Sequence, residues 1–207
     1  RGVILIEGSR ISAVGPASEI HVPDDAQIID AEGKYLIPGL IDANLHLYLN
    51  IDLETMIKYE DRYHEIIVEA AQITLKNGLT TVFDTWGPYE PLVQARALVN
   101  AGEAVGSRIF MAGNIIGFDG PLSADFRAAA AAHVSNAFVT RTNEAWEQGV
   151  GRELMWWGPE EVSARVSEYA ESEIDFLKYG ASGHVDMAFI TFSQRVQNAM
   201  EEAAHAA

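Results

Sequence analysis

Cysteine is absent from the 207 residues, which excludes disulfides, thiolate nucleophiles and cysteine-ligated metal sites. Any metal site must therefore use nitrogen and oxygen ligands. Positive charge is also scarce, because 14 Lys and Arg stand against 30 Asp and Glu, for a formal net charge of −16. Such an acidic chain repels the phosphates of nucleic acids and the anionic surface of membranes. We therefore expect no nucleic acid and no membrane among its partners, and a small molecule as its ligand.

Long apolar runs are missing as well. No run approaches the roughly 18 residues of a membrane-spanning helix, and the first residues lack the pattern of a signal peptide. We therefore expect a cytoplasmic protein, and 48% hydrophobic residues are enough to build a core. The chain opens on Arg-Gly-Val-Ile-Leu-Ile without a Met, so we expect that the natural N-terminus is missing.

The sequence pattern changes near residue 36. Before that point, short β-rich runs alternate with glycine-containing turns, which favours antiparallel hairpins. We expect part of a small β-sandwich over residues 1–36. The predicted strands are 3–7, 11–15, 27–30 and 35–37.

From residue 37 to residue 207, strands alternate with helices, which is typical of βα units around a parallel sheet. The predicted strands begin near 36, 80, 108 and 174, and the predicted helices cover about 52–77, 91–101, 159–172 and the residues from 193. This makes about four βα units, whereas a closed (β/α)8 barrel needs eight strands and roughly 250 residues. The segment is either a small α/β domain or a partial TIM barrel whose C-terminal half is missing. The chain stops within a predicted helix, which favours the partial barrel, and we expect such a fragment to be prone to aggregation.

Residues 38–46 read Pro-Gly-Leu-Ile-Asp-Ala-Asn-Leu-His. In an extended strand alternate residues share a face, so the Asn44 amide and the His46 imidazole are expected to point the same way. Together they suit a metal ion. The alternative is that both residues simply satisfy backbone groups at the end of the strand.

A second candidate is Lys178, which closes the apolar run 174–177 and precedes a Gly-Ala-Ser-Gly turn. A lysine that emerges from a buried strand is desolvated, which lowers its pKa and frees the neutral amine to act as a nucleophile. The alternative is a surface lysine whose apolar stem lies along the protein.

Further polar and aromatic side chains follow the predicted strands. Asp84 and Trp86 come at the end of the run Gly-Leu-Thr-Thr-Val-Phe-Asp, while Tyr179 and His184 follow Lys178. We name all four as candidates for a substrate pocket, although Asp84 is also suited to a structural role and the aromatic residues to plain packing. Three more tryptophans could form a lid or cover the core: Trp146, Trp156 and Trp157.

Two of these motifs resemble the amidohydrolase superfamily. Residues 33–42, Gly-Lys-Tyr-Leu-Ile-Pro-Gly-Leu-Ile-Asp, are similar to that family's passage from a β-sandwich into the first barrel strand, and residues 78–84 are similar to its second strand. The family continues the first strand with His-x-His, whereas this chain has Asn44 at the first position. The resemblance covers nearly the whole chain. It implies that Asn44, His46 and Lys178 bind metal, and that carbon dioxide converts Lys178 to a carbamate.

The resemblance also implies a reaction, in which a metal-activated water hydrolyses a C–N bond. The Asn-x-His variant resembles a smaller group acting on phenylurea and thiocarbamate compounds, which suggests a urea, carbamate or amide substrate. Because an amide oxygen is a weaker ligand than imidazole, we expect one tightly bound divalent ion, Zn or alternatively Mn or Co. The family's catalytic Asp would lie beyond Ala207, so the segment alone is expected to be inactive.

Other functions stay open. Within enzymes, the alternative is a cyclic amidase or a prolidase-like dipeptidase. Outside enzymes, the alternative is a metal-free relative that serves as a binding or scaffold protein. A homo-oligomer of the full-length protein is also open.

Overall fold

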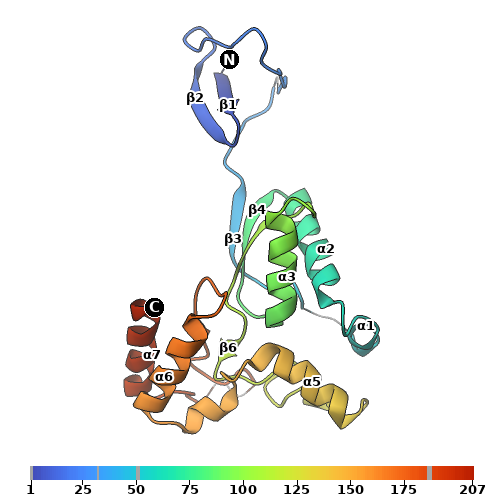
Figure 1. Cartoon of the computed structure of the whole chain (residues 1–207), viewed down its shortest axis with the longest axis vertical. Coiled ribbons are helices and arrows are strands. Elements are labelled where there is room, and N and C mark those ends of the chain that lie inside the picture. Colours follow the sequence, from blue (N-terminus) through green and yellow to red (C-terminus); the bar gives the residue numbers. More distant parts are fainter. Residues whose placement is uncertain (1, 32, 50–51, 186–187) are drawn as a thin grey trace. The chain divides into compact units, whose positions relative to one another are not determined.

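The computed structural model describes residues 2–31, 33–49, 52–185 and 188–207. The chain divides into two compact units, Arg1–Pro38 and Gly39–Ala207, which are described separately below. Figure 1 gives the course of the chain and the element labels used here.

The first unit contains an antiparallel hairpin of β1 (Gly2–Glu7) and β2 (Arg10–Pro16). Gly8 turns the chain between them with a positive φ of 61°, a conformation that favours glycine. The strands predicted at 27–30 and 35–37 are wrong, because neither run is in a strand in the structure. Neither has a neighbouring strand to pair with in the described part of the chain, and Ile29 is 84% exposed.

The second unit is built on a parallel sheet in the order β3 (Leu40–Leu45), β4 (Leu79–Asp84) and β5 (Arg108–Met111). In this register Leu45 lies opposite Asp84, and Asp84 lies opposite Met111. Helices α2 (Tyr63–Lys76) and α3 (Tyr89–Asn100) pack beside the sheet (Figure 1). The parallel strands and intervening helices confirm the predicted mixed α/β character.

The helix predicted over 52–77 is two helices. Asp52 caps α1 (Leu53–Lys58) by accepting a hydrogen bond from the backbone N–H of Thr55, and the chain then turns before α2 begins at Tyr63. In the turn, the Arg62 backbone N–H donates to the Tyr59 carbonyl at 2.7 Å. This short-range bond replaces the i→i−4 bonds that would continue the helix.

The strand predicted over 174–178 is much shorter. The structure has β7 only at Lys178–Tyr179, paired in parallel with β6 (Ile115–Ile116). At Asp175 the backbone N–H donates to the Met111 carbonyl at 2.8 Å, but the Met111 N–H donates to the Asp175 side chain at 2.9 Å. A carboxylate thus takes the place that a backbone carbonyl has in a regular ladder.

The remaining elements lie between and after these strands. They are α4 (Ala128–Ala131), α5 (Asn136–Glu147), the 3-10 helix η1 (Arg152–Trp156), α6 (Pro159–Ala170) and α7 (Gln194–Ala206). The helices predicted to begin near 159 and 193 are confirmed.

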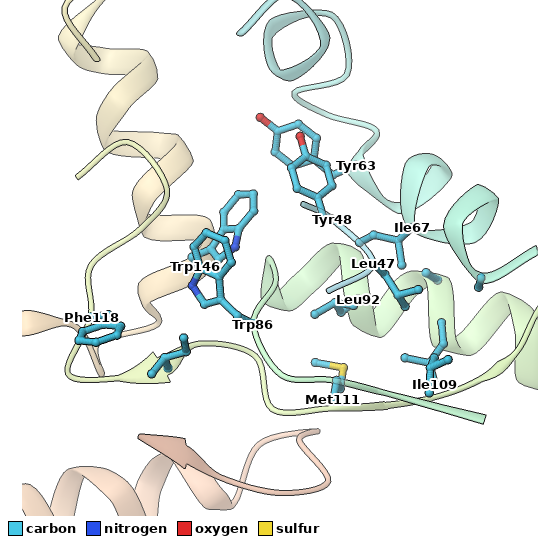
Figure 2. Packing of buried hydrophobic residues seen from close by; sticks show 14 residues of the cluster. Leu47, Tyr48, Tyr63, Ile67, Trp86, Leu92, Ile109, Met111, Phe118 and Trp146 are labelled. Carbon is cyan, nitrogen blue, oxygen red and sulfur yellow. The ribbon is translucent and has the colours of Figure 1, made fainter. Parts of the chain in front are cut away.

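The largest hydrophobic core joins the sheet, helices α2 and α3, and the aromatic residues that follow the strands. Figure 2 shows the Trp86 and Trp146 side chains together, with the Tyr48 and Tyr63 rings beyond them. Trp146 is completely buried, whereas Trp156 is 77% exposed, so the predicted tryptophan cluster is split between core and surface. Among the described residues, no helix combines the length and the hydropathy needed to cross a membrane.

Candidate metal centre and aromatic cavity

A chain of hydrogen bonds connects Lys178 at the start of β7 to Asn44 in β3. The Lys178 Nζ donates to Thr85 Oγ1 at 3.0 Å, and Thr85 Oγ1 donates to Asn44 Oδ1 at 2.6 Å. Thr85 is 5% exposed, so little water competes for its hydroxyl. The fold therefore brings together two of the three predicted metal ligands, which are far apart in sequence.

His46, the third predicted ligand, follows β3 directly. Burial and, to a smaller extent, the positive charge of Lys178 lower its pKa to about 4, although a hydrogen bond with the Trp86 backbone opposes the shift. Its Nδ1 atom is buried without a hydrogen-bond partner among the described residues. A neutral imidazole with an unsatisfied buried nitrogen is the form of histidine that ligates metal ions.

Asp84 at the end of β4 is fully buried. Its carboxyl group accepts hydrogen bonds from the backbone N–H of Leu47 at 2.7 Å and of Trp86 at 3.0 Å. Burial raises its pKa to about 7, although these two hydrogen bonds and the charge of Lys178 lower it. Asp84 thereby ties the segment after β3 to the segment after β4, which fixes the chain on both sides of the site.

Lys178 itself is half-buried. Burial lowers the pKa of its amine, while the nearby Asp84 carboxyl group raises it. The lowered pKa increases the share of the neutral amine, which is the nucleophilic form. As an ammonium, in contrast, Lys178 would repel a metal ion.

Two of these three residues can ligate a divalent metal as they stand, and the third only after modification. Asn44 and His46 offer an amide oxygen and an imidazole nitrogen, and Lys178 offers an oxygen donor only after modification. Among the described residues, no three or more His, Asp or Glu side chains lie close enough together to hold a metal ion. The unsatisfied Nδ1 of His46 is the observation that favours a metal here.

An aromatic cavity of about 390 Å³ lies beside these residues. Trp86 connects the two, because its ring lies 5.9 Å from the His46 ring, edge to face, and also lines the cavity. The other aromatic residues lining the cavity are Tyr48, Phe126, Trp146 and His184. The cavity can therefore hold an apolar group within reach of the candidate metal ligands.

The four predicted pocket residues differ in position. Trp86 and His184 line the cavity. Asp84 does not line it, but its carboxylate accepts a hydrogen bond from the Trp86 backbone N–H. Tyr179 does not line it: its ring packs in a separate cluster around Phe192, and its hydroxyl donates to Glu201 at 3.3 Å. Neighbouring residues of a strand point to opposite faces, so Lys178 and Tyr179 could not both face the site.

The sequence interpretation missed Thr85 and Phe126. Strand alternation alone gave no signal for Thr85, because Asn44 and Thr85 share a face of the sheet only through the pairing of Leu45 with Asp84, which the structure provides. Phe126 lies in an irregular segment, where no periodicity points to a role.

The chain is similar over 99% of its length to two solved structures. It is 35% identical to molinate hydrolase with a TM-score of 0.92, and 37% identical to phenylurea hydrolase B with a TM-score of 0.93. The chain belongs to the amidohydrolase superfamily. It covers 47% and 49% of those two structures, so this amidohydrolase chain spans about half their length.

Curated proteins give shorter matches. The chain is 30% identical over 129 residues to dihydroorotase of Pyrococcus furiosus, which is 60% of this chain and 28% of that protein. It is 30% identical over 80 residues to adenine deaminase 3 of Rhizobium meliloti, which is 39% of this chain and 11% of that protein. A putative prolidase from Bifidobacterium longum, at 21% identity and a TM-score of 0.63, is similar in fold alone. No protein-family model matches the chain.

Proposed function

We propose that this chain is part of a metal-dependent amidohydrolase that hydrolyses a C–N bond of a urea, carbamate or amide. The observation that carries the proposal is the hydrogen-bond chain from Lys178 through Thr85 to Asn44, together with a buried His46 that senses the charge of Lys178. The similarity to molinate hydrolase and phenylurea hydrolase B across almost the whole chain supports it.

The proposal includes the architecture. Residues 37–207 form the first half of a TIM barrel, with about four βα units, and residues 1–36 are part of a β-sandwich. The parallel β3, β4 and β5 with α2 and α3 beside them support this assignment. In such a barrel, the segments that follow the strands carry the active site. Asn44 lies near the C-terminal end of β3, and Thr85 directly follows β4. Lys178 is the first residue of the short β7.

Asn44, His46 and Lys178 would hold one divalent ion, Zn or alternatively Mn or Co. Bound there, the ion supplies Lewis acidity, which activates a water molecule and polarises the scissile carbonyl. The burial that lowers the pKa of His46 keeps its imidazole neutral and able to donate an electron pair. Thr85 orients the Asn44 oxygen, and Asp84 fixes the backbone at Leu47 and Trp86.

Lys178 would act after modification. Its neutral amine attacks the carbon of carbon dioxide, a N–C bond forms, one C=O bond opens to a carboxylate, and the nitrogen releases one proton to solvent. Counted from the ammonium form, which first loses one proton to give the neutral amine, the side chain changes from a cation to an anion, so repulsion of a metal ion becomes attraction. We assign the general base to none of the described residues.

The test uses the full-length gene product and a panel of ureas, carbamates and anilides. We expect hydrolysis that chelation abolishes and that one equivalent of Zn, Mn or Co restores, together with loss of both metal retention and activity in His46→Ala. Full activity after exhaustive chelation, or a His46→Ala variant with unchanged metal content and rate, contradicts the proposal. A protein that purifies without stoichiometric metal and hydrolyses nothing in the panel would instead be the binding or scaffold protein that the sequence leaves open.

A further inference from the structure

Asn114 lies between β5 and β6, and it is neither a predicted ligand nor one of the residues that line the cavity. It is completely buried. Its Oδ1 accepts from the Trp86 Nε1 at 3.1 Å, and its Nδ2 donates to the Phe118 carbonyl at 2.7 Å. A flipped amide would set donor against donor and acceptor against acceptor, so these two partners fix its orientation. One side chain thus ties the segment after β4 to the segment after β6.

The backbone of Asn114 is fixed from α6. Its N–H donates to the Tyr169 hydroxyl at 2.9 Å, and that hydroxyl donates to the Ala112 carbonyl at 2.8 Å. Gly113 lies between them with a positive φ of 70°, and a Cβ at this position would clash with the same hydroxyl. Asn114 is therefore held through both its backbone and its side chain, and it can hold other residues in turn.

One end of the Asn114 amide acts on His46 through Trp86. The Trp86 ring lies 5.9 Å from the His46 ring with the two planes at 85°, and the Trp86 backbone also forms a hydrogen bond with His46. Trp86 is only 5% exposed, so little water can replace a lost partner of its indole N–H. The hydrogen bond to Asn114 therefore selects the indole orientation that meets His46 edge to face.

The other end of the amide acts on Lys178 through β6. The bond from Asn114 to the Phe118 carbonyl closes a turn over residues 114–118, and within that turn the Phe118 N–H donates to the Ile115 carbonyl at 3.0 Å. Ile115 pairs with Lys178 in the parallel ladder of β6 and β7. The turn thus fixes the short strand that pairs with Lys178.

We propose that Asn114 is a positioning residue of the candidate metal centre, which holds Trp86 against His46 with one end of its amide and β6 beside Lys178 with the other. It restricts the freedom of two candidate ligands before a metal ion binds, so its loss weakens metal binding. The inference rests on the proposed function for the metal ion, whereas the orientation of the two rings does not depend on it.

The experiment compares variants of the full-length gene product. Asn114→Ala should lower zinc affinity about tenfold, measured by chelator competition. This is the low end of the range for groups that orient metal ligands, because Asn114 acts through other residues. In the metal-free protein, the NMR signals of the Trp86 indole N–H and the His46 ring should both shift, with assignments from Trp86→Phe and His46→Ala. Unchanged zinc affinity in Asn114→Ala would overturn the inference.

A control separates positioning from a general loss of stability. The Asn143 side chain also accepts from a backbone N–H, that of Leu122 at 2.9 Å, but it lies on α5. Asn143→Ala should destabilise the fold without moving the signals of Trp86 and His46 and without changing zinc affinity. An equal loss of affinity in Asn143→Ala contradicts the role of Asn114.

Trp86→Phe cuts the same hydrogen bond from its other end, and it keeps the inference testable if Asn114→Ala does not fold. It should lower zinc affinity by a similar factor. The double variant should lose less than the product of the two single losses, because both changes break one interaction. Wild-type zinc affinity in Trp86→Phe, or losses that multiply fully in the double variant, would mean that Asn114 does not act through Trp86.

The results also distinguish this inference from the proposed function. If the wild type binds zinc and hydrolyses a C–N bond, but Asn114→Ala binds zinc equally well, the inference fails and the proposed function stands. If the wild type binds no zinc while both ring signals still move in Asn114→Ala, the proposed function fails and the orientation of Trp86 and His46 by Asn114 stands.

Discussion

The amine of Lys178 donates a 3.0 Å hydrogen bond to the hydroxyl oxygen of Thr85, and this links its charge to the amide of Asn44. A hydroxyl that accepts from a cation polarises its own O–H and donates more strongly. The orientation of Asn44 therefore depends on the protonation and modification of a lysine that lies on a different strand.

The first prediction concerns Thr85. Thr85→Val keeps the shape but removes the hydroxyl, so Asn44 Oδ1 and Lys178 Nζ both lose a partner. Since residues that orient metal ligands typically affect affinity by about 10–100-fold, we expect a loss in that range in metal affinity, measured by chelator competition. Thr85→Ser should restore most of it, because it restores the hydroxyl. Wild-type affinity in Thr85→Val would show that the hydroxyl orients nothing.

Lys178 gives a second prediction. Lys178→Ala should lower kcat/KM of the full-length gene product by more than about 100-fold, beyond the usual range for a residue outside the ligand set. Added acetate or propionate should restore part of the rate, because a free carboxylate can replace the carbamate. The control is Lys76→Ala, which removes an exposed lysine at the end of α2 and should change neither rate nor metal content.

If Lys178→Ala retains its metal and its rate, Lys178 is not a ligand. Loss of activity without any rescue, but with the metal retained, would contradict the carbamate and leave only an electrostatic role.

The third prediction concerns Asn44. An amide oxygen is a weaker ligand than imidazole, so the wild-type protein should retain one metal ion per subunit after dialysis. Asn44→His should change the stoichiometry, or change kcat/KM by about tenfold or more, as read by elemental analysis beside kinetics. Asn77→His, at the end of α2, is the control for adding a histidine elsewhere. Two tightly held ions in the wild type would refute the idea.

A fourth prediction concerns pH and a site away from the metal. Burial raises the pKa of Glu147, a hydrogen bond from the Gly120 N–H opposes this, and Asp119, Glu153 and Glu144 raise it further. The folded state then holds this proton more tightly than the unfolded state does. The resulting stability is present below about pH 4.5 and is lost as pH rises through the folded pKa.

Glu147→Gln keeps a neutral side chain at every pH, so its Tm relative to wild type should rise between pH 4 and pH 7. Thermal unfolding across that range measures the difference. Glu69→Gln, which removes the same charge from an exposed position of α2, should show no such rise. A constant or falling difference for Glu147→Gln would mean that burial of this carboxyl group costs the fold nothing.

The sequence predicted the elements whose periodicity agrees with their packing. Strands β4 and β5 and helices α3, α6 and α7 lie within a few residues of the prediction, because their apolar residues face a core. Residues 174–178 failed as a strand because the side chain of Asp175, rather than a backbone carbonyl, accepts from Met111. Residue propensities for strand formation do not predict a hydrogen bond between residues so far apart in sequence.

The site was predictable where it depends on strand alternation. Asn44 and His46 were proposed as ligands from their spacing and Lys178 from its position after an apolar run, and these roles stay predictions. Tyr179 was chosen as a pocket residue although it must face away from Lys178. Thr85 and Phe126 required knowledge of which strands and loops come together in space. Tertiary contacts, rather than local pattern, decide such residues.

The contacts of Asp175 connect a helix next to the sheet with the candidate site. Its carboxylate accepts from the Met111 backbone N–H and also from Arg96 Nη1 at 2.9 Å, and Arg96 lies on α3. Lys178 is three residues further along the same segment, so the contact between α3 and Asp175 helps to position this proposed metal ligand. Directed evolution of such an enzyme could therefore tune the centre from Arg96, a position that no active-site library would include.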